Sequence, residues 1–231
     1  MTNLIITPVF RAYDKVLEMC EAIDKLTVNP YVHILVDDDS DIGEFPVKAS
    51  EKRRILLMKR DYTGVIHKNG AGQAIQLALC WAYQKFLNEY ANPLPYDNVF
   101  LIESDVIPLE EGWDQKMVDI KATLPEDWLT LDVQSVDTEG KLTYPTTVAP
   151  RIGMERDDLE IMYYPDFQCC LFNLKIFESK IRFSDFASHF DKMFGEKTIE
   201  VFGGRHFRTT LIKVLHYTYQ SRQFLNEIPK Q

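Results

Sequence analysis

Residues 98–108 read NVFLIESDVIP. Val99 to Ile102 form an apolar run of β-favouring residues, which predicts a buried strand. The run is followed at once by two acids, Glu103 and Asp105, and Pro108 ends the element. An ionised carboxylate is costly near a core unless it has a partner, and side chains two positions apart on extended backbone point the same way. The pair therefore suits a divalent cation, although a strand that simply reaches solvent would also carry acids there.

The residues before this stretch alternate between short apolar runs and segments with helical spacing. Strands are expected at 4–6 (stopped by Thr7-Pro8), 32–36, 54–58 and 99–103, and helices at 12–26 and from Gln73 to about residue 92. This alternation predicts an α/β domain with a Rossmann-like, mainly parallel sheet flanked by helices. Right-handed crossovers place the carboxyl ends of such strands on one edge, where open sheets bind ligands. The acids after residue 36 and after residue 102 are therefore expected near one crevice.

The second half of the chain is less regular. A helix is expected at 112–124, strands at 128–133, 167–172 and 211–217, and a partly helical segment at 176–194. Residues 137–166 are rich in Pro, Asp and Thr, with a turn signal at Glu139-Gly140. A long stretch without clear periodicity is often functional or mobile.

Composition excludes several classes of protein. The chain has 231 residues, 45% of them hydrophobic, and a formal net charge of −9, which disfavours binding to nucleic acid. The start of the chain has no signal-peptide pattern and no apolar run reaches the length of a membrane helix, so we expect a cytoplasmic protein without an integral membrane segment. The 4 cysteines show no metal-binding spacing and are expected to be buried free thiols.

Several motifs in this order resemble family-2-type glycosyltransferases with the GT-A fold. The run LIITPVF at 4–10 and the run HILVDDDS at 33–40 are similar to that family's "IIPVYN" and "IIVVDDGS". Asn69 to Ala82 is similar to the family's Asn/Gly-containing helix start, Glu103-Ser104-Asp105 stands at its Asp-x-Asp, and Trp113 resembles the segment after that motif. The resemblance covers about residues 3–125 and weakens afterwards.

The resemblance implies a GT-A fold and transfer of a sugar, with inversion, from a nucleotide-diphosphate donor to an acceptor hydroxyl. One GT-A-like domain is expected over 1–231, with a nucleotide-binding half at 1–110 and an acceptor-side half at 111–231. The residues expected to contact the nucleotide sugar are Thr7, Pro8, Val9, Asp37, Asp38, Asn69, Glu103 and Ser104. Asp38 matches the family's acid best, because a carboxylate there can accept hydrogen bonds from a pyrimidine or a ribose. A turn acid at this place is the alternative.

A metal site is implied at the same edge. Asp105 is the expected direct ligand of Mn²⁺ or Mg²⁺, with Glu103 holding ribose or a metal-bound water, since hard cations prefer oxygen ligands shared with substrate phosphates. Glu103 replaces the family's usual Asp. His216 stands where many relatives place a late His that approaches the metal. A strand histidine that makes only a structural hydrogen bond would show the same sequence pattern.

Inverting transfer also needs a base that takes the proton of the acceptor hydroxyl. Relatives carry a pair of acids before a late helix, and the matching run here is FGEKTIE at 194–200. Glu196 aligns with the first acid and is the expected base, with Asp185 and Glu200 as reserves. Lys197 replaces the second acid, which is a departure from the family. A solvated glutamate at a helix start would look the same.

Two further classes of function stay open. A degenerate transferase kept as a binding or scaffold protein is favoured modestly by the replacements at Glu103 and Lys197. A sugar nucleotidyltransferase is less favoured, because residues 7–12 contain no glycine, and a nicotinamide-binding protein is disfavoured because no GxGxxG follows the first strand. The expected partners are a nucleotide-diphosphate sugar and a glycan or other hydroxyl acceptor. Polysaccharide biosynthesis is the expected setting, and a lipid-linked acceptor would require peripheral contact with a membrane.

Overall fold

The computed structural model describes residues 1–10, 12–38, 40, 43–58, 70–82, 95–143, 151–177, 179, 181–183 and 190–217. Among the residues considered above, Asp39, Asn69 and Asp185 lie outside these ranges. In the described parts of the chain no helix is long and apolar enough to cross a bilayer.

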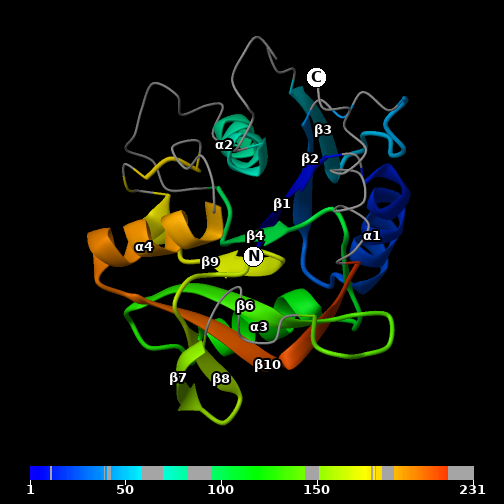
Figure 1. Ribbon diagram of the computed structural model, residues 1–231. Coiled ribbons are helices and arrows are strands. Elements are labelled where there is room, and N and C mark those ends of the chain that lie inside the picture. The colour runs from blue at the N-terminus through cyan, green and yellow to red at the C-terminus, as the bar shows by residue number, and fades with distance from the viewer. Residues whose placement is uncertain are drawn as a thin grey trace, which may run out of the picture.

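The described residues form one mixed β-sheet with helices on both faces (Figure 1). Its strand order is β3-β2-β1-β4-β9-β6-β10-β8-β7, and β5 pairs with β10. The strands are β1 (Asn3–Val9), β2 (Tyr31–Asp38), β3 (Arg53–Met58), β4 (Asn98–Ile102), β5 (Val106–Pro108), β6 (Trp128–Val136), β7 (Arg151–Arg156), β8 (Leu159–Met162), β9 (Cys169–Phe172) and β10 (Arg205–His216). The helices are α1 (Tyr13–Leu26), α2 (Gly70–Ala82), α3 (Trp113–Lys121) and α4 (Phe190–Phe202), with a short 3₁₀ turn η1 (Leu174–Ile176).

The first half of the sheet is parallel, as the alternation of elements predicts. Strand β1 lies between β2 and β4, and β3 pairs with the outer side of β2, all in parallel register. The prediction that Thr7-Pro8 stops β1 is wrong, because β1 continues to Val9. Pro8 is tolerated there because β1 pairs with β2 along its whole length but with β4 only along residues 3–6, so one side of Pro8 needs no ladder hydrogen bond.

The second half adds antiparallel pairs. Strand β9 runs antiparallel to both β4 and β6, while β10 runs parallel to β6 and antiparallel to β8 and β5. The stretch at 137–166, expected to lack regular structure, contains the hairpin β7–β8. Strand β7 is mostly exposed, so its sequence shows no alternation between apolar and polar positions. The strand expected at 167–172 begins at Cys169, because Phe167 has φ +59 and leaves the extended region.

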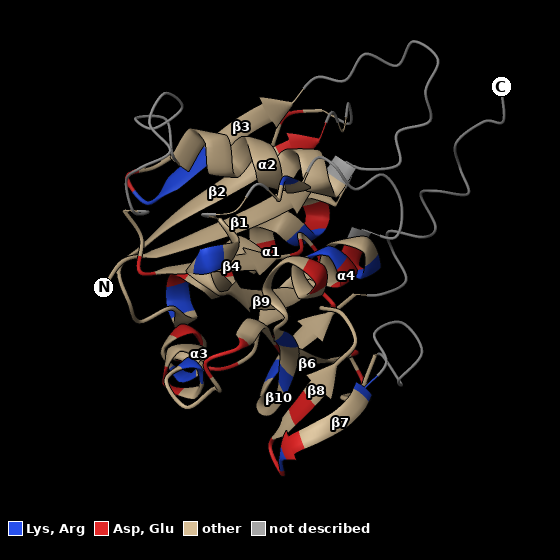
Figure 2. Ribbon diagram, turned by 90° about the vertical axis from the view of Figure 1, so that its left-hand side faces the viewer, with Lys and Arg blue, Asp and Glu red and all other residues tan. Residues whose placement is uncertain are grey.

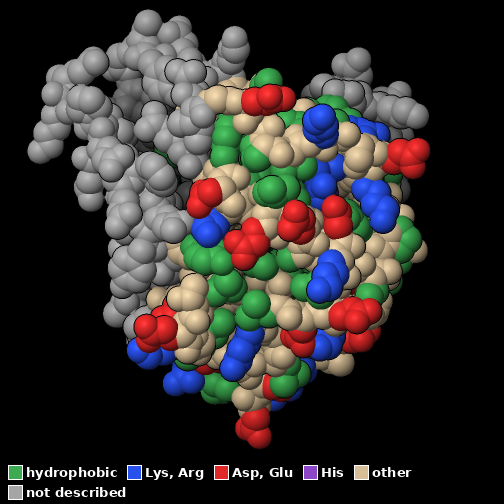
Figure 3. All heavy atoms as spheres, turned by 90° about the vertical axis from the view of Figure 1, so that its right-hand side faces the viewer, with side chains coloured by type: hydrophobic (Ala, Val, Ile, Leu, Met, Phe, Trp, Pro, Cys, Tyr) green, Lys and Arg blue, Asp and Glu red, His purple; other side chains and the backbone are tan. Residues whose placement is uncertain are grey.

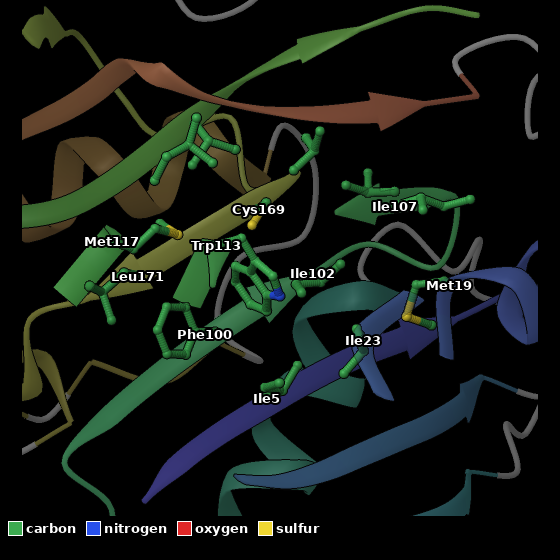
Figure 4. Close-up of a cluster of buried hydrophobic side chains, with 14 of the residues drawn as sticks. Ile5, Met19, Ile23, Phe100, Ile102, Ile107, Trp113, Met117, Cys169 and Leu171 are labelled. Carbon is green, nitrogen blue, oxygen red and sulfur yellow. The ribbon is translucent and has the colours of Figure 1, made fainter. Parts of the chain in front are cut away.

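Side chains of successive strand residues enter two separate cores. Ile5 packs with α1 and α3 on one face, and Leu4 and Ile6 pack with α2 and α4 on the other. Figure 4 shows the first core, where Trp113 of α3 lies against Phe100 of β4 with ring centroids 5.3 Å apart. This three-layer packing anchors every strand that leads to the site described below. Helix α2, which packs on the second core, carries no charged residue (Figure 2).

Candidate metal and nucleotide site

Glu103 and Asp105 follow strand β4 at the carboxyl edge of the parallel half of the sheet. The backbone turns there, because Val106 N–H donates to the carbonyl of Glu103 at 3.1 Å, and Ser104 lies inside this turn. Asp37 and Asp38 end strand β2, which is separated from β4 by β1, at the same edge. The structure therefore places both acidic strand ends on one edge of the sheet, as the crossovers predict.

Strand β10 brings His216 to the two acids from the far end of the chain. His216 pairs with Val106 of β5, and Tyr217 N–H donates to the carbonyl of Asp105 at 3.1 Å. The His216 Nε2 atom lies 3.6 Å from an Asp105 carboxylate oxygen and 3.9 Å from a Glu103 carboxylate oxygen. One ligand atom from each of Glu103, Asp105 and His216 lies within 4.8 Å of the others. We call these three residues the metal triad.

The metal triad fits a divalent cation. Two carboxylates supply the oxygen ligands that Mn²⁺ and Mg²⁺ prefer, and the imidazole suits a transition metal such as Mn²⁺ better than Mg²⁺. Partial burial of Glu103 raises its pKa well above the usual range, and the nearby carboxylate of Asp105 raises it further. The more distant charges of Asp191 and Asp166 act in the same direction. A cation at this place would offset the repulsion between these carboxylates.

The acids at the end of β2 are held in place by neighbours. Asp37 is 8% exposed and accepts hydrogen bonds from Tyr13 Oη at 2.9 Å and from Ser40 Oγ. Asp38 is 3% exposed. Asp37 is thus fixed by groups from α1 and from the loop after β2, which orients the strand end.

The three residues expected at the base pocket end strand β1. The Thr7 side chain is fully buried and lies 3.0 Å from His33 Nε2, so it belongs to the interior. Val9 is buried as well, whereas Pro8 is half-buried, and the contact of these three residues with a base stays a prediction. Burial of His33, with the charge of Arg53, lowers its pKa to about 3, so this histidine is a neutral structural residue.

Glu196, the expected base, lies on α4 with a partly exposed side chain. Its carboxylate accepts a hydrogen bond from Tyr163 Oη at 3.2 Å and lies 3.8 Å from Lys192 Nζ. Glu200 is exposed and pairs with Lys197 at 2.8 Å. Neither of these two carboxylates is among the charges that raise the pKa of Glu103.

Asp191, in the first turn of α4, is a residue that the sequence motifs missed. Its pKa is raised to about 7, first by burial and then by the charge of Asp166, and its own charge acts on Glu103. Asp191 could have been found as an acid in the first turn of a helix. The sequence predicts only a partly helical segment at 176–194, however, and does not show where α4 begins. Without that boundary the sequence could not separate Asp191 from other acids.

A buried ionic group connects this region to the sheet. Arg208 of β10 is 7% exposed and donates to Glu160 of β8 at 2.7 Å and to Asp166 at 3.1 Å. Asp132 of β6 stands beside Arg208 in the ladder and is 1% exposed. Burial raises the pKa of Asp132 well above its usual range, and the charge of Asp166 adds to this.

The space-filling view in Figure 3 shows one face of the molecule, on which acidic and basic side chains are interspersed. No band of one charge dominates this face.

Comparison with known proteins identifies the fold. No protein-family model matches the chain, and no curated protein matches it in sequence. Solved structures do match, although at low identity. TarS from S. aureus, a glycosyltransferase of the GT-A fold, superposes with a TM-score of 0.59 over 94% of this chain at 12% identity. TarS residues 1–349 in complex with UDP superpose with a TM-score of 0.58 at 12% identity.

The match extends over most of this chain but only over part of the relatives. The chain spans 36% of TarS and 60% of its 1–349 fragment. A mycobacterial protein matches with a TM-score of 0.61 at 14% identity, with 96% of this chain and 69% of that protein covered. Structures of the TarS fragment hold UDP in one case and UDP-GlcNAc in another. The chain therefore has an α/β fold with a parallel core that matches the GT-A fold of TarS.

Proposed function

We propose that this protein is a metal-dependent glycosyltransferase that moves a sugar, with inversion, from a nucleoside-diphosphate sugar to an acceptor hydroxyl. The observation that carries the proposal is the metal triad at the carboxyl edge of a GT-A-like sheet. The segment after β4 and the end of β10 converge there, which is more than a solvent-exposed strand end requires.

Residues 1–110 are proposed as the nucleotide-binding half and 111–231 as the acceptor-side half of one domain. The backbone of Thr7 to Val9 would line the base, and Asp38, beside Asp37, would accept hydrogen bonds from the base or ribose. Support comes from the position of both segments at the carboxyl edge of neighbouring parallel strands. Open α/β sheets bind nucleotides at this edge.

Asp105 and His216 are proposed as direct ligands of Mn²⁺ or Mg²⁺, with Glu103 as a third ligand or as the group that holds ribose. Bound metal would stabilise the charge that develops on the leaving diphosphate. The protein's own contribution is to hold the three side chains at their spacing, through the β5–β10 pairing and the Tyr217–Asp105 hydrogen bond.

Asp191 is proposed as the base in preference to Glu196. A pKa of about 7 lets a carboxylate be ionised at neutral pH and still accept a proton effectively. The charge of Asp191 also contributes to the raised pKa of Glu103, which supports a position in the same region of the molecule. Glu196 instead faces Tyr163 and Lys192. With Asp191 as the base, the lysine at position 197 would have no catalytic role to fill.

UDP-GlcNAc is the donor to test first, because TarS binds it. The decisive experiment is calorimetric titration of UDP, UDP-GlcNAc and other nucleotide sugars with and without Mn²⁺. We expect Mn²⁺-dependent binding in the wild type and its loss in Asp105→Ala. Asp119→Ala on α3, which removes an exposed carboxylate, is the matched control and should bind normally.

Undiminished donor affinity of Asp105→Ala in the presence of Mn²⁺ would refute the assignment of the metal site. Metal-dependent donor binding without turnover of any nucleotide sugar would instead favour the binding or scaffold protein. Failure of the whole panel to bind to folded protein would refute the transferase and leave the scaffold protein as the better explanation.

A further inference from the structure

Asp166 is a buried carboxylate that the proposed chemistry does not use. It is 9% exposed and lies between β8 and β9. Its Oδ2 atom accepts a hydrogen bond from Arg208 Nη1 at 3.1 Å, while its Oδ1 atom has no hydrogen-bond partner within the described part of the chain. A buried acceptor left unpaired is costly, so this atom is suited to a donor that comes from elsewhere.

Arg208 fixes the orientation of this carboxylate. The guanidinium is itself held by Glu160, whose Oε2 accepts from Arg208 Nε at 2.7 Å, and the whole group is buried. Glu160, Arg208 and Asp132 stand side by side across β8, β10 and β6. Because Oδ2 of Asp166 is bound to the firmly held guanidinium of Arg208, Oδ1 is directed away from that guanidinium.

The loop that carries Asp166 lies beside Glu103 and against α4, where the rings of Phe167 and Phe194 have centroids 5.0 Å apart. Glu103 N–H donates to the carbonyl of Gln168 at 3.0 Å, which sets this loop beside the triad. Phe167, which lies between Asp166 and Gln168 in the chain, has φ +59. This backbone conformation costs energy for a bulky residue and is retained mainly where the surrounding structure requires it. The charge of Asp166 acts on Glu103 on one side and on Asp191 on the other.

A second unpaired acceptor belongs to the same loop. Gln168 is 3% exposed, and its Oε1 atom has no hydrogen-bond partner among the described residues. By continuation of the β4–β9 ladder, Gln168 stands opposite Glu103. Two buried acceptors beside the triad, both without a donor, indicate a ligand that offers several hydroxyl groups.

We propose that Oδ1 of Asp166 accepts a hydrogen bond from a hydroxyl group of the transferred sugar, and that Arg208 is the residue that positions it. This inference rests on the proposed function. A sugar in transfer lies between the diphosphate at the metal triad and the acceptor hydroxyl beside Asp191, which is the place where Asp166 lies. The nucleotide lies over β1 and β2, so it makes no contact with Asp166.

The test compares the affinities of UDP and UDP-GlcNAc, each with Mn²⁺, in wild type and in Asp166→Asn. The ratio of the two affinities isolates the contribution of the sugar. We expect Asp166→Asn to lower this ratio about tenfold or more, as loss of a hydrogen bond to a charged acceptor does, and to leave UDP affinity unchanged. Asp127→Asn is the matched control, because it breaks the pair of Asp127 with Arg205, three residues from Arg208 on the same strand. Its ratio should equal that of the wild type.

Asp166→Glu provides a second test if Asp166→Asn does not fold, because it keeps the charge beside Arg208 but displaces the accepting oxygen. An unchanged ratio in these variants would overturn the inference, as would an equal loss for UDP and UDP-GlcNAc. Equal affinity of the wild type for both ligands would overturn it too. Absence of Mn²⁺-dependent UDP binding in the wild type would overturn the proposed function, and the inference with it.

Discussion

At the scale of single residues, the two acids of α4 differ in what surrounds them. Burial raises the pKa of Asp191 to about 7, and the charge of Asp166 adds to this shift. Glu196 lies beside a lysine and a tyrosine hydroxyl. The same type of side chain is thus suited to proton transfer in one place and to surface pairing in the other.

This contrast predicts opposite results for two isosteric variants on one helix. Asp191→Asn should lower kcat about 10²–10⁴-fold with donor affinity retained, because a general base contributes about that much. Glu196→Gln should keep most of the activity. Steady-state kinetics with calorimetric donor binding check both. The opposite pattern would return the role of base to Glu196.

Metal binding should depend on pH through Glu103. Its folded-state pKa is raised, so a proton competes with the cation over a pH range where an ordinary glutamate is already ionised. Affinity for Mn²⁺ should therefore be weaker at pH 5.5 than at pH 7.5, and Glu103→Gln should weaken binding and flatten this dependence. Titration of Mn²⁺ at several pH values measures it. Equal slopes in wild type and variant would contradict the proposed part of Glu103.

At the scale of elements, the site depends on how α4 packs against the loop after β8. Thr198 and Gly195 of α4 approach His206 of β10, and burial lowers the pKa of His206 to about 4. A Cβ atom on Gly195 would lie 2.4 Å from Cβ of Tyr164. The glycine thus allows the helix to lie directly on the loop that leads to Asp166.

Gly195→Ala should therefore displace α4 or the loop and lower the free energy of unfolding by about 1–3 kcal/mol, as overpacking does. Gly153→Ala is the control, because its added Cβ would meet Ile161 Cδ1 at an ordinary 3.7 Å. Denaturant unfolding of both variants checks this. Equal stability of the two would show that the contact at Gly195 relaxes without cost.

At the scale of the whole molecule, the carboxyl edge of the sheet carries the site while the amino edge carries a structural network. Asp114 of α3 is fully buried and accepts hydrogen bonds from Asn3 Nδ2 at 3.0 Å and from the backbone of Val28 and Asn29, each at 3.1 Å. Asn98 in turn donates to Asn3 at 2.9 Å. One carboxylate therefore ties α3 to the starts of β1, β2 and β4.

Asp114→Ala should lower the free energy of unfolding by about 2–4 kcal/mol, because it leaves several buried donors without an acceptor. Donor affinity of the folded variant should stay that of the wild type, since the network lies at the edge opposite the site. Asp119→Ala, on the exposed side of the same helix, should be neutral. A change in donor affinity without a change in stability would contradict this separation of the two edges.

The sequence by itself determined the parallel half of the fold and the residue types at its carboxyl edge. Apolar runs of strand length that alternate with an amphipathic helix leave few other arrangements, and the acids that end β2 and β4 follow those runs directly in the chain. Local patterns suffice there because crossover handedness is nearly invariant. The motif likeness also named His216 as a candidate metal ligand, and the structure brings its Nε2 atom to 3.6 Å from a carboxylate oxygen of Asp105.

Tertiary structure alone decided the rest. Strand β10 begins at Arg205, six residues before the strand that the sequence predicts. The sequence pattern does not reveal this part of the strand, because its buried positions include the polar residues His206, Arg208 and Thr209. They are tolerated in the sheet because partners arrive from distant parts of the chain, such as Thr130 for His206 and Glu160 for Arg208. The same is true of Asp166 and Asp191, whose properties come from neighbours and not from their own local sequence. A pairing between residues far apart in the chain leaves no periodic signal, so only the folded molecule shows it.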